Sequence, residues 1–439
     1  MLLEYNCNPD LCNNENKSPL LVATRLGFTE IVKLLLSHNC NTNIVDRDMI
    51  SASHEAVVVN GKESEKLLLG IKSDMYIRSN YQESALYIAS LYGRTDIVEL
   101  LLQSKCNPDL CNTDNVSPLY AACCNGHDDI VLSLLDHGCD LYKSDKDNKS
   151  PLYVASAKGY TTIVKYLLEY KCDLNLCNTD NKSPLFIASC NGHIEIAKLL
   201  LKGKGCDPNI SSNEGKTPLN IAATFGHREV VEVLLRHKCH ANVCDNNKRS
   251  SLYNATLKGY TAIVKMLLKY NCNPDLCNNE NKSPLLDATR LGYTDIVKLL
   301  LVHNCTPNFV DRDTISALHV AVAVNNKEIT KLLLEHKCDM YIRSKFQESA
   351  LYIACRYGRT DIVKLLLQNK CNPDLCERNK ESSLLTASRF GHTETVKLLL
   401  QYSIKSDLLY KNLWTALNRV KGAADGDQAV IKNLLLNYV

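Results

Sequence analysis

One segment of the chain recurs at a constant step of 33 residues. It is clearest at residues 150–182, and the neighbouring copies begin at Ser117 and Ser183. A fixed period of this length is typical of repeat proteins, in which each unit contacts only its neighbours along the chain. The 439 residues therefore predict one elongated array, although length alone would suggest roughly three globular domains.

Each unit predicts two short helices followed by an extended, polar turn. Ser150 can cap a helix whose first residue, Pro151, lacks the amide hydrogen that a first turn leaves unpaired. Gly159 favours the end of that helix, because glycine adopts left-handed backbone at little cost. The apolar stripe of a second, amphipathic helix consists of Ile163, Val164, Leu167 and Leu168. One unit buries too little apolar surface to fold alone, so the units must stack.

The recurring pattern Ser/Thr-Pro-Leu-x-x-Ala, a later Gly and Ile-Val-x-x-Leu-Leu resembles the ankyrin repeat. Residues 217–222 (TPLNIA) and 183–188 (SPLFIA) come close to the TPLHxA signature of that family. The signature histidine survives only as His54 and His319, so its usual hydrogen bond to the capping hydroxyl is expected to be mostly absent. The resemblance covers essentially the whole chain. It implies an all-α solenoid of stacked helix–turn–helix units with hairpin loops, whose members bind other proteins.

The repeat divides the chain as follows. The residues that open successive units are Ser18, Ser51, Ser84, Ser117, Ser150, Ser183, Thr217, Ser250, Ser283, Ser316, Ser349, Ser382 and, with a weaker match, Thr415. We interpret residues 18–400 as ankyrin repeats 1–12, residues 401–439 as a C-terminal capping repeat, and residues 1–17 as the end of a truncated repeat. One step departs from 33 residues, through an extra residue near residues 203–205 that is expected in a loop.

The start of the chain duplicates a later part. Residues 1–110 match residues 266–375, and Met1 aligns with Met266 inside a second helix. The chain is therefore expected to begin in the middle of a helix, without an N-terminal cap. Two explanations stay open: a fragment of a longer array, or a start codon chosen too far downstream.

Repeat 2 is expected to be the weakest unit. Ser53 replaces the leucine of the first helix, and a Ser-Glu pair at residues 64–65 replaces the Ile-Val pair of the second. Asn60 stands where glycine is usual. The matching repeat 10 keeps Leu318 and Ile329, so the change belongs to the first copy.

The composition excludes several classes of function. A formal charge of +3 is too small to indicate a nucleic acid or an acidic membrane as the partner. No apolar run approaches the roughly 18 to 20 residues of a membrane span, and no signal-like segment opens the chain. We expect a cytoplasmic protein, with the nucleus as the alternative.

The cysteines follow the repeat. Of 21, eleven occupy the place eleven residues before the opening Ser or Thr: Cys7, Cys40, Cys106, Cys139, Cys172, Cys206, Cys239, Cys272, Cys305, Cys338 and Cys371. The ankyrin family usually has a small buried alanine there, and a reduced cysteine is a small buried hydrophobe. Six more follow five residues later, and C-x4-C is not a usual zinc spacing. We expect reduced, structural thiols, against an alternative of disulfides or a metal site.

Apparent active-site residues also recur with the repeat. Eleven of the twelve histidines occupy repeating positions, whereas a catalytic residue would be singular. Residues 215–217 (GKT) mimic the end of a phosphate-binding loop, but Ile210 stands where that motif needs glycine. Sequons such as the one at Asn181 recur where asparagine serves as a turn residue that tolerates left-handed backbone. We expect no enzyme, cofactor, metal or small-molecule substrate.

The resemblance implies that hairpin tips and first helices line a concave surface that chooses the partner. Towards both ends of the chain these positions hold arginine and large apolar residues, the kinds enriched at interface hot spots. The predicted partner-binding residues are Arg47, Arg78, Tyr81, Leu91, Tyr92, Arg290, Leu291, Arg312, Arg343, Phe346, Arg356, Tyr357, Arg389 and Phe390. The alternative is that these side chains merely cover the groove.

The predicted function is a non-enzymatic scaffold or adaptor, a monomeric rod that binds partner proteins through its concave face. One alternative is the truncated recognition region of a larger protein, such as a ligase adaptor, channel or kinase. An enzyme is the competing class. Because repeats 2 and 3 are duplicated in repeats 10 and 11, the sequence also suggests two similar docking sites.

Overall fold

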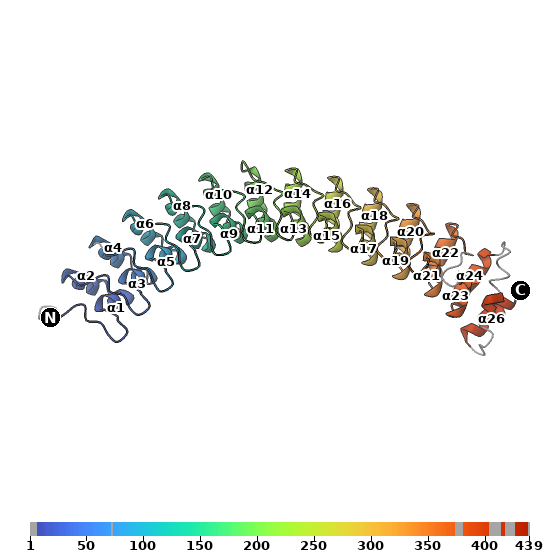
Figure 1. The fold of residues 1–439 in the computed structure, drawn as a ribbon, viewed down its shortest axis with the longest axis horizontal. Helices are drawn as coiled ribbons and strands as arrows, with labels where there is room; N and C mark the ends of the chain where they lie inside the picture. Colours follow the sequence, from blue (N-terminus) through green and yellow to red (C-terminus); the bar gives the residue numbers. More distant parts are fainter. Residues whose placement is uncertain (1–6, 72, 374–380, 404–413, 418–425, 438–439) are drawn as a thin grey trace. The chain divides into compact units, whose positions relative to one another are not determined.

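The computed structural model describes residues 7–71, 73–373, 381–403, 414–417 and 426–437 (Figure 1). Its contacts divide the chain into two units, Met1–Ala222 and Ala223–Val439. The division falls inside one helix, α13 (Pro218–Phe225). Each unit is described by itself.

In the first unit the helices come in pairs, one inner and one outer helix per repeat. The bounds are α1 (Pro19–Arg25), α2 (Thr29–Ser37), α3 (Ala52–Val58), α4 (Lys62–Gly70), α5 (Ala85–Tyr92), α6 (Thr95–Gln103), α7 (Pro118–Asn125), α8 (Asp128–Asp136), α9 (Pro151–Lys158), α10 (Thr161–Glu169), α11 (Pro184–Asn191) and α12 (Ile194–Lys202). Inner helices pack on the inner helices of neighbouring repeats, and outer helices pack on outer helices, so the unit has two helical layers (Figure 1).

The second unit continues the same order. Its helices are α14 (Arg228–Arg236), α15 (Ser251–Leu257), α16 (Thr261–Lys269), α17 (Pro284–Arg290), α18 (Thr294–Val302), α19 (Ala317–Ala323), α20 (Lys327–Glu335), α21 (Ala350–Arg356), α22 (Thr360–Gln368), α23 (Ser383–Arg389), α24 (Thr393–Ser403) and α26 (Asp427–Leu436). The predicted all-α solenoid of helix pairs is confirmed.

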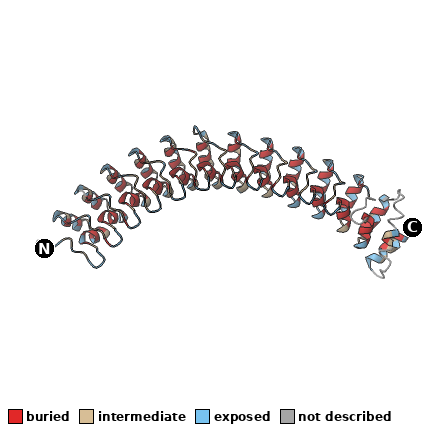
Figure 2. Cartoon of the chain, in the orientation of Figure 1, coloured by how far each residue is buried: buried red, intermediate tan, exposed pale blue. Residues whose placement is uncertain are grey.

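The predicted helix boundaries are confirmed in residues 150–182, the copy in which the repeat pattern is clearest. The Ser150 hydroxyl accepts a hydrogen bond of 3.1 Å from the Tyr153 amide, with Pro151 as the first helical residue. Gly159 ends α9 in left-handed backbone, with φ of 84°. Ile163 and Leu167 of α10 are fully buried, and Figure 2 shows the buried residues of each pair concentrated between the two layers.

Hydrogen bonds tie each hairpin loop to the next. The Asp109 carboxylate accepts a bond of 2.8 Å from the Asp140 amide. The Asn181 side chain donates to the Ser211 carbonyl at 2.7 Å while its own φ is 58°, as predicted for a left-handed turn residue. The side-chain amide of Asn181, the asparagine of the sequon, therefore already donates a hydrogen bond to the neighbouring loop.

Aromatic rings pack over the glycines that end inner helices. A Cβ added to Gly126 would lie 2.9 Å from the Tyr160 ring, and one added to Gly93 would lie 2.7 Å from the His127 ring. Both glycines also have positive φ, near 75° (78° and 72°). These positions require glycine both for its backbone conformation and for the close approach of the next repeat.

The polar residues of repeat 2 face the core, as the sequence predicted. Ser53, Ser64 and Glu65 are all buried. The Ser53 hydroxyl donates a hydrogen bond to Glu65 Oε1, while Glu65 Oε2 has no hydrogen-bond partner. Burial raises the pKa of Glu65 to about 7. In repeat 10 the corresponding residues are Leu318, Ile329 and Thr330, and all three are buried.

Both ends of the chain are described only in part. Helix α26 packs on α23 and α24, and its Ile431 and Leu435 are fully buried, which confirms the predicted final helix. Much of the predicted capping repeat, residues 404–413 and 418–425, lies outside the described residues, as do residues 1–6 of the predicted truncated repeat. The extra residue near residues 203–205 follows the end of α12, in a loop as predicted.

Candidate protein-binding surface

A row of exposed apolar side chains follows the ends of the inner helices in repeats 9–12. Each member lies eight residues after the opening serine, where the backbone leaves the core. The row consists of Leu291, Val324, Tyr357 and Phe390, exposed by 45%, 46%, 51% and 46%. Four consecutive repeats thus present one large apolar group each on the same side of the stack.

Arginines accompany this row, and carboxylates hold two of them. Arg356 Nη1 lies 2.9 Å from Glu348 Oε1, and its guanidinium carbon lies 5.8 Å from the centre of the Tyr357 ring. Arg389 repeats the arrangement, with a guanidinium carbon 5.7 Å from the Phe390 ring centre. Ring and ion pair together restrict the arginine side chains, which lowers the entropy they would lose on binding.

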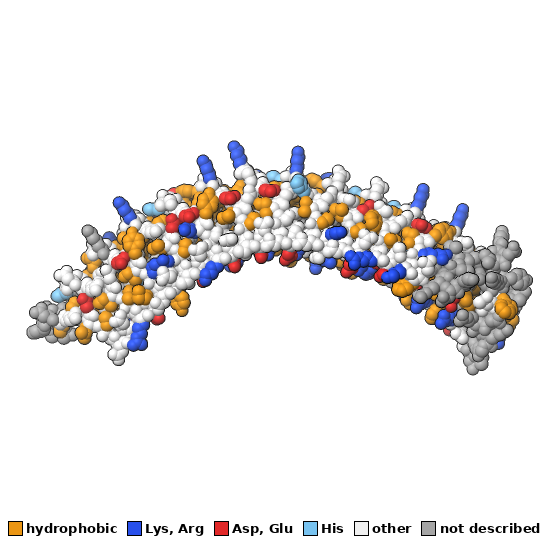
Figure 3. Space-filling model, in the orientation of Figure 1, with side chains coloured by type: hydrophobic (Ala, Val, Ile, Leu, Met, Phe, Trp, Pro, Cys, Tyr) orange, Lys and Arg blue, Asp and Glu red, His pale blue; other side chains and the backbone are white. Residues whose placement is uncertain are grey.

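The second of these arginines is held by Glu381, whose Oε1 lies 3.4 Å from Arg389 Nη1. Arg290 is exposed at the same place in repeat 9. In Figure 3, Lys and Arg side chains gather along the lower edge over α17 and α19. Repeats 9, 11 and 12 therefore place an arginine directly before the exposed apolar residue, whereas repeat 10 has Ala323 there.

The first unit carries a related surface on repeats 1–3. Leu26, Val59 and Tyr92 are exposed at the same position eight residues after the opening serine, and Tyr81 is exposed on the neighbouring hairpin. Leu91 is half-buried. In repeats 4–6 the same position holds only polar residues, Asn125, Lys158 and Asn191. Within this unit the apolar groups are confined to one end.

The predicted hairpin arginines lie differently from the helix-end arginines. Arg47 Nη2 donates to the Asn14 carbonyl at 2.5 Å, and Arg312 Nη2 donates to the Asn279 carbonyl. Arg78 also donates to a carbonyl of the next hairpin, that of Cys111. These three guanidiniums join neighbouring loops, so their hydrogen-bonding capacity is partly used within the fold.

Of the remaining predicted residues, Phe346 is exposed on its hairpin and Arg343 is half-buried beside it. The structure thus brings the predicted residues of repeats 9–12 onto one surface and those of repeats 1–3 onto another. Sequence reasoning missed Glu348 and Glu381. Both glutamates directly precede the opening serine of their repeat, and this shared position could have drawn attention to them. The sequence pattern does not indicate, however, that this position contacts the arginine eight residues later.

The histidines serve the packing between repeats. His127, His193 and His392 each place Nε2 within 3.0 to 3.2 Å of a carbonyl oxygen of the preceding repeat. His54 and His319 make the signature hydrogen bond to the capping serine at 2.7 Å, and burial lowers the pKa of both. Their recurrence therefore has a structural cause.

A tyrosine takes the place of the signature histidine in several repeats. The Tyr120 hydroxyl donates to Asp145 Oδ2 at 2.8 Å, in the loop of the next repeat. The Tyr87 hydroxyl accepts from Asn112 Nδ2 at 3.1 Å. In these two repeats the tyrosine hydroxyl thus joins the inner helix to the neighbouring loop. It does not reproduce the hydrogen bond that a signature histidine makes to the capping serine.

Cysteines of the repeated position lie in the core. The buried members of that set are Cys40, Cys106, Cys139, Cys172, Cys239, Cys272, Cys305, Cys338 and Cys371. Burial raises the pKa of Cys139 to about 12, so its thiol is protonated at neutral pH and is a poor nucleophile. In the part of the chain that the structure describes, no three His, Cys, Asp or Glu side chains are grouped as metal ligands.

Helix pairs that stack on one another, with hydrogen bonds between their hairpins, define a class of solenoid protein. In this class the buried residues are similar from repeat to repeat, and the exposed residues differ. The family model of ankyrin repeats (3 copies) matches overlapping segments that tile the chain: residues 1–78, 53–145, 86–176, 140–212, 204–279, 237–311, 285–375, 318–412 and 351–438. The chain belongs to the ankyrin-repeat family. No curated protein matches it.

Ankyrin repeats are generally protein–protein interaction modules. Over the described ranges, every helix is too short or too polar to traverse a lipid bilayer.

Proposed function

We propose that this chain is a non-enzymatic scaffold that binds partner proteins through the ends of its inner helices and its hairpins. The observation that carries the proposal is the apolar row of repeats 9–12 beside its ordered arginines. Exposed aromatic groups and arginine are enriched among residues that dominate interface energies. A suitable partner would cover the apolar side chains of Tyr357 and Phe390. It would also supply carboxylates to the neighbouring arginines, Arg356 and Arg389.

The two surfaces of the chain support two docking sites. Tyr81 and Tyr92 of the first unit recur as Phe346 and Tyr357 of the second, and all four side chains are exposed. Because the hairpin arginines partly serve the fold, we assign the contact energy mainly to the aromatic residues and the helix-end arginines. We infer a reducing compartment, the cytoplasm or the nucleus, because buried thiols recur through the core.

The proposal is tested with a partner recovered on the intact chain. Replacing Leu291 and Tyr357 by aspartate removes two apolar contacts, and we expect the affinity of the site on repeats 9–12 to fall about a thousandfold, since hot-spot residues contribute about 2 kcal/mol or more each. The control replaces Val302 and Tyr402, an exposed aliphatic residue and an exposed tyrosine near the ends of outer helices α18 and α24. Loss of binding in the control with retention in the first variant would place the interface elsewhere.

A further inference from the structure

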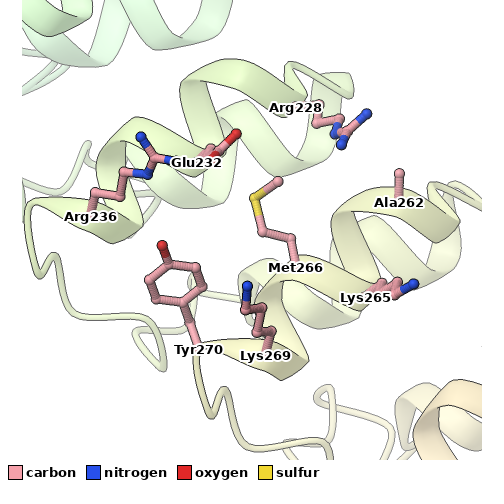
Figure 4. Close-up of a pocket in the computed structure, with 8 residues that line it drawn as sticks. All are labelled: Arg228, Glu232, Arg236, Ala262, Lys265, Met266, Lys269 and Tyr270. Atoms are coloured by element: carbon pink, nitrogen blue, oxygen red, sulfur yellow. Dashed lines mark hydrogen bonds and ion pairs between the residues drawn. The ribbon is translucent and has the colours of Figure 1, made fainter.

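An open hollow lies between the outer helices of repeats 7 and 8. Helices α14 and α16 pack side by side, and the space between their outward-facing residues measures about 480 Å³. Ala262 leaves room at one end, and the flexible side chain of Met266 lies in the middle (Figure 4). This hollow is in the outer layer, away from the inner-helix surface proposed above to bind partners.

Positive charge surrounds the hollow. Arg228 and Arg236 line it from α14, and Lys265 and Lys269 line it from α16 (Figure 4). The one carboxylate among the lining residues, Glu232, already lies 2.5 Å from Arg236 Nη2. Among the described residues no carboxylate lies within ion-pair distance of the other three cations, so the site holds an excess of positive charge.

A second pair of outer helices in the same chain shows what the hollow lacks. Between α8 and α10, the hydroxyl of Tyr170 donates a hydrogen bond to the carboxylate of Asp136. The same two repeat positions in α14 and α16 hold Arg236 and Tyr270. Figure 4 shows the Tyr270 hydroxyl pointing toward Arg236, with a cation where the other pair has an acceptor. An acidic ligand would supply the carboxylate that this pair of helices lacks.

We propose that the hollow between α14 and α16 binds an acidic peptide segment of a partner protein. Arg228 and Arg236 are eight residues apart, which is about 12 Å along a helix, and Lys265 and Lys269 are about 6 Å apart. A single phosphate group is too small to contact all of them. Carboxylates spaced along a segment fit that distribution, and an apolar side chain between them would lie on Met266 and the Tyr270 ring.

The test uses the intact chain and a fluorescein-labelled peptide that repeats Glu-Glu-Leu-Glu, with binding followed by fluorescence anisotropy in about 50 mM salt, where screening is weak. Replacing Lys265 and Lys269 by glutamate removes two attractions and adds two repulsions. We expect affinity to fall about tenfold, because two exposed ion pairs with the peptide are lost and two repulsions replace them. Circular dichroism verifies that the variant keeps its helices.

The matched control replaces Lys327 and Lys331 of α20 by glutamate, which changes the net charge equally. Those lysines already have carboxylates nearby, with Lys327 Nζ 3.4 Å from Asp361 and Lys331 Nζ 3.8 Å from Glu335. The control should bind the peptide within twofold of the unaltered chain. Equal loss in both variants, or no binding by the unaltered chain, overturns the proposal. Binding of phosphatidylserine vesicles but not of the peptide, lost in the Lys265/Lys269 variant, also overturns it and indicates a membrane surface as the ligand.

Discussion

The hydroxyl of Ser53 donates a hydrogen bond to the carboxylate of Glu65 within the core of repeat 2. The two residues replace a leucine and a valine of the repeat pattern, one on each helix of the pair. Glu65 has a second oxygen that is buried without a partner. A buried carboxylate with half of its hydrogen bonds is costly when ionised, so the protonated form is favoured in the folded state.

The first prediction is that repeat 2 loses stability as the pH rises. Burial raises the pKa of Glu65 from 4.5 to about 7, so the folded state binds a proton that the unfolded state releases between these values. Protonated Glu65 therefore contributes about 3 kcal/mol to the free energy of unfolding. This contribution is fully present below pH 4.5 and is lost as the pH rises through about 7. Amide hydrogen exchange in α3 and α4, corrected for intrinsic rates, should be faster at pH 8 than at pH 5.

The control for this pH effect is Glu65→Gln, which cannot ionise. His54 of the same repeat acts in the opposite direction, because burial lowers its pKa and folding then favours the neutral ring at higher pH. The informative quantity is therefore the difference between the two chains. An equal pH dependence of exchange in both would show that Glu65 is ionised in the folded state.

The second prediction is that residues 18–83 open before the repeats that follow. Ile31 of α2 is 46% exposed, whereas the corresponding Ile296 of repeat 9 is fully buried. Repeat 2, next to it, carries Ser53 and Glu65 in place of apolar residues. Since solenoid stability is a sum of repeat and interface contributions, both differences lower local stability. Amide protection equal to that of residues 150–202 would contradict this.

The third prediction concerns two glycines of repeat 4 with similar backbone. Gly126 and Gly138 have φ of 78° and 72°, but only Gly126 would place a Cβ against a neighbour, 2.9 Å from the Tyr160 ring. Gly138→Ala should cost about 1 kcal/mol for left-handed backbone. Gly126→Ala should cost about 1 to 3 kcal/mol more, because the ring must move. Urea unfolding measures both variants.

A double variant separates the two contributions at Gly126. Adding Tyr160→Ala to Gly126→Ala removes the ring, so the steric part of the cost should disappear while the backbone part stays. If the cost of Gly126→Ala is the same with and without the ring, the close approach of Tyr160 does not determine the choice of glycine.

The fourth prediction is a binding stoichiometry of two for a partner that recognises the duplicated surfaces. Replacing Arg343 and Arg356 by glutamate should lower it to one, because repeats 2 and 3 are unaltered. Titration calorimetry measures the number of sites directly. One site located in repeats 4–6 and insensitive to these changes would contradict the two-site proposal.

The fifth prediction is that all cysteines are thiols. Titration of unfolded, unreduced protein should count close to 21. In the folded protein the buried members should react slowly, because burial raises the pKa of Cys139 and Cys172 to about 12. A count well below 21 in fresh protein, or stoichiometric zinc in protein purified without chelator, would reverse this assignment.

Local chemistry made most of the fold predictable. A Ser-Pro pair and a glycine nine residues after the serine specify both ends of an inner helix through capping and left-handed backbone, as at Ser150 and Gly159. The constant spacing then implies the stack. Contacts that join repeats were harder to predict, because they depend on which side chains face each other across a distance set by packing. The His127 ring over Gly93 is one such contact.

The binding surface was predictable in position but not in detail. The exposed side chains of Tyr357 and Phe390 follow from their place after the helix end. The ion pair between Glu348 and Arg356 does not, since it requires knowing that the residue before the cap lies beside the last turn of the same helix. Likewise the sequence could not show that Arg47, which is exposed like Arg290, is bonded to a neighbouring loop.

The hydrogen bonds between hairpins have a consequence for how such a chain changes over generations. The Asp109 carboxylate serves the very next loop, and so does the Asn181 amide. Excising or copying a whole number of repeats therefore leaves each loop beside another loop of the same repeat pattern. Unequal recombination of the gene can lengthen or shorten the protein without passing through an unfoldable intermediate. The match between residues 1–110 and 266–375 is the kind of record such an event leaves.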